Sequence, residues 1–196
     1  MKFAKLLIAA AAVAAVFSAQ AESDLTLAPA TGGSASAKLD FRITVPRIIF
    51  LRVGTGTNFA DALGAANINL VDFTLTANNL TSGAAIAGVP NAGASATAGA
   101  VDARVLGNGG SVSFTAVGSG AGLVAPGVAT PVAWSQIAPT AAGSLPHPVI
   151  GGAATSLTAT NNVVNASSTW TFNYTNSAAI AAGVYTGQVT YTAALP

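Results

Sequence analysis

Apolar and polar residues alternate most regularly near the start of the chain, between Ser36 and Val45. Successive side chains of an extended strand point to opposite faces, so this alternation gives the strand one apolar face and one polar face. The apolar positions are Leu39, Phe41, Ile43 and Val45. Pro46 ends the alternation, because proline has no N–H to donate to a strand ladder. The pattern therefore predicts a β-strand with one face suited to burial.

Short apolar segments separated by turn residues predict further strands along the chain. Arg47–Val53 is densely apolar and predicts a more buried strand. Ile68–Thr76 changes its apolar phase partway, which indicates a bulge or a bend between sheets. Pro131–Ile137 predicts a short strand around a tryptophan, and Ser82–Ala100, rich in alanine, glycine and serine, predicts a long surface loop.

A turn signal lies in the middle of the chain. Val101–Leu106 and Ser111–Val117 have strand character and flank the sequence Gly-Asn-Gly-Gly at 107–110. Asn-Gly pairs favour tight β-hairpins, since both residues tolerate positive φ. We therefore predict that the two segments pair as a hairpin around Asn108.

The C-terminal part of the chain carries the clearest core signals. Thr169–Tyr174 places three aromatic residues on one face, and the final strand, Gly183–Leu195, places further aromatic and aliphatic residues on one face. The predicted core residues are Trp170, Phe172, Tyr174, Tyr185, Val189 and Tyr191. With no convincing amphipathic helix, the sequence predicts an all-β sandwich or barrel.

The N-terminus has the three parts of a secretory signal peptide. Lys2 and Lys5 precede an apolar run from Leu6 to Phe17, and small residues at Ala19 and Ala21 suit a cleavage site before Glu22. The run is short for a membrane span. We expect a signal peptide over residues 1–21, an N-terminal extension over 22–46 and a β-sandwich domain over 47–196.

Charge and cysteine content narrow the function classes. Charged residues make up 7% of the chain and there is no cysteine, so an exported chain of this composition takes no stability from disulfides. Beyond residue 21, five basic residues remain against six acidic ones. This balance argues against a nucleic-acid partner, and the low charge favours a surface covered by neighbouring subunits.

The candidate catalytic residues are sparse. His147 is the sole histidine, with no cysteine to pair with it and no Gly-x-Ser-x-Gly motif on a strand-to-helix turn. The six acidic residues are isolated, so we interpret them as solvated aspartates and glutamate rather than a catalytic pair. We expect no enzyme, no metal site and no cofactor, with His147 in a loop.

The two ends of the chain beyond residue 21 bear a family resemblance. The segment 37–46, Ala-Lys-Leu-Asp-Phe-Arg-Ile-Thr-Val-Pro, resembles the N-terminal donor strand of chaperone–usher fimbrial subunits, in particular the cysteine-free major pilins of the colonisation-factor and common-pilus (alpha-type) group. The segment 182–192 is similar to the Gly-x-Tyr-x-Gly-x-Val closing strand of the same pilins, and Pro131–Ile137 is similar to their middle strand.

The resemblance implies a fold and an assembly. The fold would be an immunoglobulin-like β-sandwich that lacks one strand and is completed by donor-strand exchange, with Leu39, Phe41, Ile43 and Val45 inserted into a neighbouring subunit. The partners would be other copies of the chain, a periplasmic chaperone and an outer-membrane usher. The protein would then be a fimbrial subunit at the cell surface, with a role in adhesion or biofilm.

Three alternatives use the same residues differently. In a monomeric secreted binding module, Ser36–Val45 would pair within its own chain, and the sequence alone does not decide between these pairings. A small outer-membrane barrel would need strands of about ten residues with aromatic girdles, which only the last strand approaches. An enzyme would need an acid–base set that the sequence does not supply.

Overall fold

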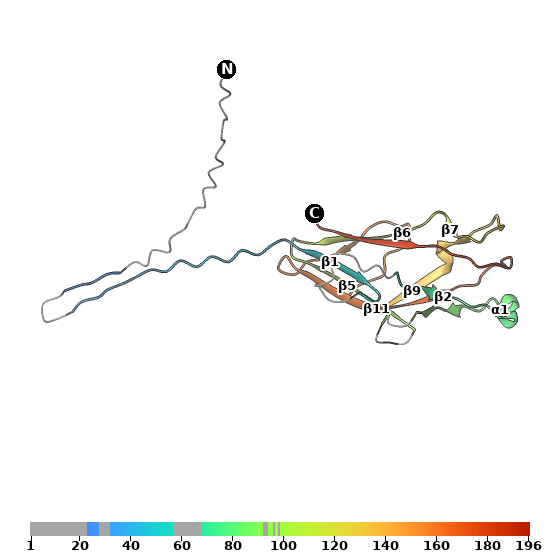
Figure 1. Cartoon of the computed structure of the whole chain (residues 1–196), viewed down its shortest axis with the longest axis horizontal. Helices are drawn as coiled ribbons and strands as arrows, with labels where there is room; N and C mark the ends of the chain where they lie inside the picture. Colours follow the sequence, from blue (N-terminus) through green and yellow to red (C-terminus); the bar gives the residue numbers. More distant parts are fainter. Residues whose placement is uncertain (1–22, 28–31, 57–67, 92–93, 96, 98) are drawn as a thin grey trace, which may run out of the picture. The chain divides into compact units, whose positions relative to one another are not determined.

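The computed structural model describes residues 23–27, 32–56, 68–91, 94–95, 97 and 99–196 (Figure 1). The predicted signal peptide, residues 1–21, lies outside these ranges. The chain divides into two units between Val45 and Pro46. All strands assigned in the described ranges belong to the second unit, residues 46–196, which is an all-β sandwich as expected.

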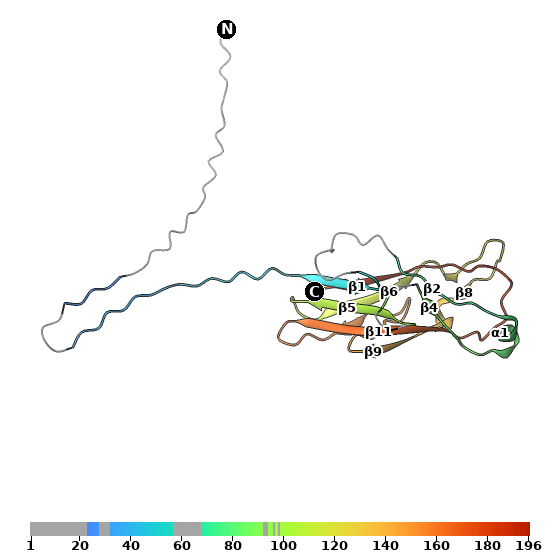
Figure 2. The same cartoon turned by 60° about the horizontal axis from the view of Figure 1, so that its bottom comes forward.

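The larger layer is a five-stranded antiparallel sheet in the order β1-β5-β11-β3, with β9 also paired to β11. Figure 2 shows β1, β5, β11 and β9 in this order. Its strands are β1 (Ile49–Val53), β3 (Ile86–Ala87), β5 (Val101–Gly107), β9 (Ile137–Gly143) and β11 (Val164–Tyr174). The long β11 is central because β5 pairs along one of its edges and β9 along the other.

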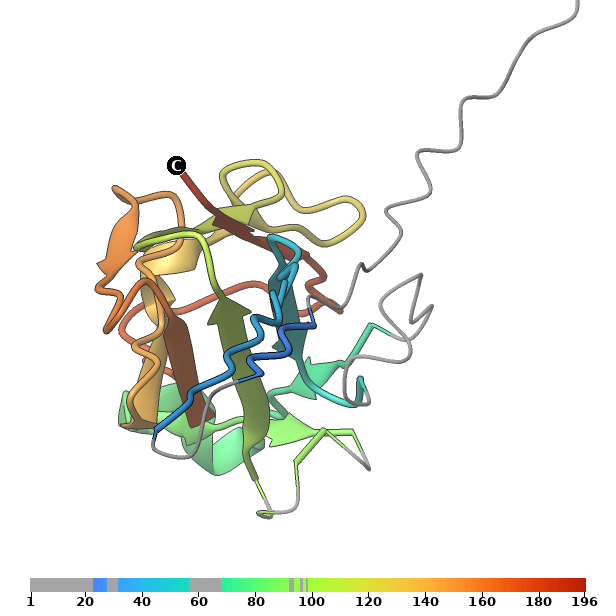
Figure 3. The same cartoon turned by 90° about the vertical axis from the view of Figure 1, so that its left-hand side faces the viewer.

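The second layer is a three-stranded antiparallel sheet with β6 between β10 and β12. Its strands are β6 (Val112–Gly118), β10 (Thr155–Leu157) and β12 (Val189–Ala194). Seen from the end in Figure 3, β6 and the red β12 lie above the sheet that contains β1 and β5. The smaller elements are β2 (Val71–Asp72) paired with β4 (Val89–Pro90), β7 (Gly122–Leu123) paired with β8 (Val132–Ala133), helix α1 (Ala77–Ser82) and a 3-10 turn at Trp134–Gln136.

The core lies between the two sheets and is built on the period of two in β11. Every second residue of β11 is buried, and Trp170, Phe172 and Tyr174 are 0%, 8% and 3% exposed, which confirms their predicted place in the core. Phe114 of β6 stacks on Trp170 across the sandwich, with ring centroids 6.2 Å apart. The buried indole N–H of Trp170 donates to the Leu145 carbonyl at 3.1 Å, so this polar group is satisfied inside the core.

The predicted hairpin around Asn108 is wrong. Both strands exist, but β5 pairs with β1 and β11, whereas β6 pairs with β10 and β12 in the other sheet. The turn is a corner at which the chain crosses from one layer to the other. Positive φ falls at Gly110 and not at Asn108. The Asn108 side chain instead forms hydrogen bonds with the backbone of Pro46 and Ile48.

Several other strand boundaries also differ from the sequence prediction. In Ile68–Thr76 only Val71–Asp72 is a strand, Ser82–Ala100 contains the short strands β3 and β4, and Pro131–Ile137 passes from β8 into a 3-10 turn. The last strand begins at Val189 rather than Gly183. Tyr185, Val189 and Tyr191 are half-buried rather than fully in the core. Val189 and Tyr191 belong to β12, which lies at the edge of its sheet, and Tyr185 precedes that strand.

Residues 32–45 of the first unit contain no helix or strand, so the predicted strand Ser36–Val45 has no strand partner in the described part of the chain. We call residues 36–45 the arm. Its four apolar side chains are all exposed, from 66% for Leu39 to 88% for Ile43. Within the described ranges, no helix combines the length and the apolar character needed to span a membrane.

Candidate functional site

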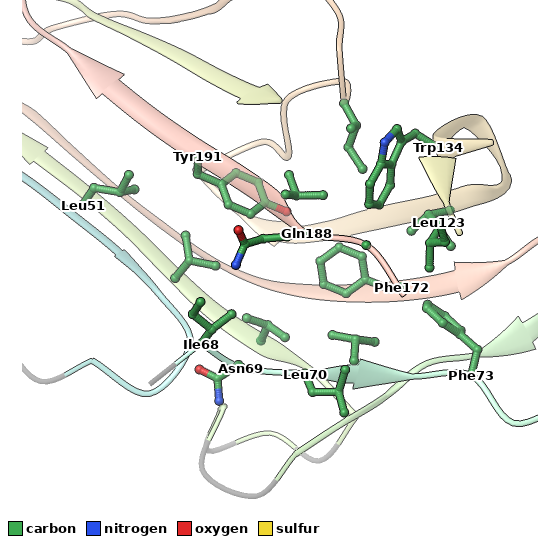
Figure 4. A pocket seen from close by; sticks show the side chains of 17 residues that line it. Leu51, Ile68, Asn69, Leu70, Phe73, Leu123, Trp134, Phe172, Gln188 and Tyr191 are labelled. Carbon is green, nitrogen blue, oxygen red and sulfur yellow. The ribbon is translucent and has the colours of Figure 1, made fainter. Parts of the chain in front are cut away.

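An open apolar groove runs along one side of the sandwich, between β1 and the segment 68–73 on one wall and β12 on the other (Figure 4). Its volume is about 570 Å³. The lining residues are Leu51, Val53, Ile68, Asn69, Leu70, Val71, Phe73, Val101, Leu123, Trp134, Ile137, Ile150, Phe172, Gly187, Gln188, Val189 and Tyr191. None of these side chains is charged, so the groove suits an apolar occupant.

The floor and walls of the groove follow from strand alternation. Val101 and Phe172 are buried residues of the larger sheet and reach the floor from β5 and β11. Leu51 and Val53 line the wall from β1, and both are half-buried. These apolar side chains pack against the core on one side and face an open groove on the other.

Within the described ranges, both walls include a strand edge that no other strand pairs with. Among the described strands, β12 pairs only with β6 and β1 pairs only with β5. An edge strand presents backbone donors and acceptors that favour addition of another strand. The groove therefore combines apolar side-chain sites with two sheet edges, which is the arrangement that binds an extended peptide by β-augmentation.

Asparagine side chains fix the rim formed by segment 68–70. The Asn69 amide donates to Asn91 Oδ1 at 2.9 Å, and Asn69 Oδ1 accepts from the Thr55 backbone N–H at 2.8 Å. Asn91 Oδ1 also accepts from the Leu70 N–H at 3.0 Å. These bonds satisfy the polar groups of the rim and leave Ile68 and Leu70, 74% and 64% exposed, along the opening.

Trp134 forms one end of the groove by packing on two glycines. A Cβ built on Gly187 would lie 2.7 Å from the Trp134 ring, and one built on Gly118 would meet the indole nitrogen. Any larger residue at either position would displace the ring. The buried indole Nε1 makes no hydrogen bond to any residue in the described part of the chain, so an unsatisfied donor lies in the groove wall.

Tyr191 connects the groove to the core through His147. The Tyr191 hydroxyl and His147 Nε2 lie 2.7 Å apart, and the imidazole ring packs edge-on against Trp170 at 4.7 Å and Phe172 at 5.5 Å. Burial lowers the pKa of His147 to about 4, and the neighbouring Pro148 backbone opposes this shift only in part. Burial also raises the pKa of Tyr191.

These contacts describe a half-buried structural pair. His147 does lie in a loop, between β9 and β10, but it packs against core aromatics rather than facing solvent. Within the described ranges no group of three His, Cys, Asp or Glu residues could hold a metal ion.

The structure brings together some of the residues that sequence reasoning singled out. Val189, Tyr191 and Phe172 line the groove, whereas Trp170 and Tyr174 are buried away from it. The family resemblance implied an open groove, but the sequence did not indicate which residues line it. The change of phase between Ile68–Leu70 and Phe73 was the available signal, since it marks a segment that leaves one sheet and borders an opening.

No family model, curated protein or solved structure matches this chain. The fold and the site by themselves define an all-β sandwich with an unfilled apolar groove between two strand edges. The resemblance to fimbrial subunits rests on the residues of segments 37–46 and 182–192, with a weaker similarity at Pro131–Ile137.

Proposed function

We propose that this chain is a structural subunit of a bacterial surface fimbria, in which the arm of one copy fills the groove of the next. The observation that carries the proposal is that one chain holds two complementary parts. The second unit has an apolar groove between two strand edges, and the first unit has an exposed extended segment with alternating apolar side chains.

Burial of the arm supplies a large driving force. Leu39, Phe41, Ile43 and Val45 are 66%, 86%, 88% and 72% exposed in the single chain. Each would contribute roughly 1.5–3 kcal/mol on full burial. An uncovered groove and arm would both promote non-specific association, and mutual insertion removes both surfaces from water.

The chemistry of the arm matches that of the groove. Its apolar face would meet a lining without charged side chains. Its other face, with Lys38, Asp40 and Arg42, would stay in water. A shift of one residue would bury these charges, so the alternation also fixes the register.

Export and assembly complete the proposal. The predicted signal peptide would direct the chain to the periplasm, where a chaperone would protect the groove until an outer-membrane usher allows one arm to bind the next subunit. No cofactor is needed for strand insertion. At the cell surface the polymer would serve adhesion or biofilm formation.

Deletion of residues 22–45 tests the proposal. The truncated chain is expected to stay non-polymeric and to be folded fully only when a peptide covering residues 36–45 is supplied, as followed by circular dichroism and by binding of the peptide. A matched control is the same peptide with Phe41 and Ile43 replaced by serine, which is expected not to bind.

The alternative is a monomeric secreted binding module, and the size of the groove favours it as a second candidate. A volume of about 570 Å³ falls within the range of small-molecule sites. If the truncated chain is a stable monomer that ignores the peptide, the fimbrial proposal fails and this second function takes its place.

A further inference from the structure

Asn108 holds the first residues of the second unit in an extended conformation. Its Oδ1 accepts from the Ile48 N–H at 2.7 Å, and its Nδ2 donates to the Pro46 carbonyl at 2.7 Å. The Asn108 backbone N–H also donates to the Ile48 carbonyl at 3.3 Å. One donor and one acceptor on the backbone fix the orientation of the amide, because only its oxygen can accept and only its nitrogen can donate.

These bonds extend the ladder between β1 and β5. The strand register begins at Ile49 opposite Gly107, and the Asn108 side chain continues the pairing to Pro46. In an extended chain the C=O of one residue and the N–H two residues later face the same side. Pro46–Ile48 therefore runs straight on from β1 and makes no turn. We call the Asn108 contacts with Pro46 and Ile48 the clamp.

Arg47 adds a second attachment at the same place. Its guanidinium donates to the Pro196 carbonyl. The side chain passes over Gly109, where any Cβ would collide with it. The three residues before β1 are thus bound both to the corner between the sheets and to Pro196, which follows the end of β12.

We infer that the clamp commits the arm to a second copy of the chain by preventing it from folding back into its own groove. This inference rests on the proposed function, in which the arm occupies a groove. A parallel arrangement of the arm beside β1 would need a crossover of a dozen or more residues, and only three separate Val45 from Ile49. The arm could lie beside its own β1 only as a hairpin.

The turn of that hairpin would fall on Pro46–Ile48, the residues that the clamp holds straight. Closing the hairpin would break both side-chain hydrogen bonds of Asn108 and the contact of Arg47 with Pro196. Moving the turn into the arm would remove apolar residues from the inserted strand. Insertion of the arm into a second copy breaks none of these bonds. The clamp therefore favours insertion into a second copy over insertion into the arm's own groove.

Disulfide trapping tests the inference in the full-length chain, which has no cysteine of its own. Phe41→Cys or Ile43→Cys on the arm is combined with Val189→Cys on the groove wall. Two arm positions are used because either residue could lie opposite Val189, depending on the register of the inserted arm. Oxidised protein is analysed by non-reducing electrophoresis and mass spectrometry. With Asn108 intact, the expected product is a ladder of chains joined to one another. Co-export of one chain carrying only the arm cysteine and one carrying only Val189→Cys is expected to give crosslinked dimers.

Asn108→Ala is expected to raise the ratio of intrachain to interchain disulfide by on the order of tenfold, since two hydrogen bonds of ordinary strength are lost. Asn108→Asp keeps an acceptor for Ile48 but no donor for Pro46, and should fall between. Asn165→Ala, which removes an exposed asparagine from β11, is the matched control and should leave the ratio unchanged. If circular dichroism shows that Asn108→Ala does not fold, the ratio measured for Asn108→Asp decides the test.

The outcomes separate the inference from the proposed function. Intrachain disulfides with Asn108 intact would overturn the inference, and so would an unchanged ratio in the folded Asn108 variants, while both leave arm insertion standing. If no cysteine pair forms a disulfide in any variant, the arm does not enter the groove and the proposed function itself fails.

Discussion

The hydroxyl of Tyr191 lies 2.7 Å from Nε2 of His147, so the strand that borders the groove is bonded to the only histidine of the chain. His147 in turn packs against Trp170 and Phe172 in the core. A change in the charge of His147 is therefore expected to affect packing both in the core and at the groove.

Acidification is expected to destabilise the folded chain. The pKa of His147 is lowered from 6.5 to about 4 in the fold, so between these values the unfolded state binds more protons than the folded state. Stability due to this group is fully present above pH 6.5 and decreases as the pH falls to about 4, by on the order of 3 kcal/mol. Urea unfolding at several pH values measures the slope of the unfolding free energy against pH.

His147→Gln is the control for this prediction. Glutamine can still bond to the Tyr191 hydroxyl but does not titrate, so the contribution of this position to the slope between pH 4 and 6.5 should disappear. A slope that persists unchanged in the variant would assign the effect to other groups.

Truncation of Trp170 is expected to cost about 3–5 kcal/mol of unfolding free energy, because the side chain is 0% exposed and its removal leaves a large cavity. The lost hydrogen bond to the Leu145 carbonyl adds to the cost. Denaturant unfolding of Trp170→Ala measures it. Thr171→Ala, at the exposed neighbouring position of β11, should change stability far less, and a loss below about 1 kcal/mol for Trp170→Ala would contradict the core assignment.

Replacement of Gly187 is expected to disturb the groove. A Cβ at this position would lie 2.7 Å from the Trp134 ring, so Gly187→Ala should cost about 1–3 kcal/mol through overpacking and weaken arm binding. The double variant Gly187→Ala/Trp134→Leu should recover part of this loss, since the smaller side chain makes room. Strictly additive effects of the two changes would show that they do not interact.

A charge on the apolar face of the arm is expected to prevent polymer formation. Phe41→Asp would place an unpaired carboxylate in a groove lined by no charged residue, which is costly. Electron microscopy and size-exclusion chromatography of exported full-length protein measure polymer content. Arg42→Asp introduces the same residue one position along, on the polar face, and should leave polymer formation intact. Equal effects of the two changes would refute the predicted faces of the arm.

Sequence periodicity predicted the centre of the fold well. In β11 the alternation of Trp170, Phe172 and Tyr174 agrees with their burial. A central strand is paired on both edges, so every second side chain points into the core. The final strand was predicted less well. Val189 and Tyr191 share the same alternation but are half-buried, since burial at an edge strand depends on what lies beside it.

The corner at Asn108 shows what a local signal leaves open. Gly-Asn-Gly-Gly correctly marks a reversal of the chain, but turn chemistry does not determine which sheet receives the next strand. The lining of the groove was equally hard to predict, since Leu51, Ile68 and Tyr191 come from three distant segments that only the fold brings together.

The position of Trp134 gives the protein an internal optical probe. The chain has two tryptophans: Trp170 is sealed in the core, whereas Trp134 is half-buried in the groove wall beside Gly187. Filling the groove would exclude water from the Trp134 indole and change the surroundings of the buried Trp170 far less. A blue shift of emission that is absent in Trp134→Phe would thus follow the proposed joining of subunits in real time, without any attached dye.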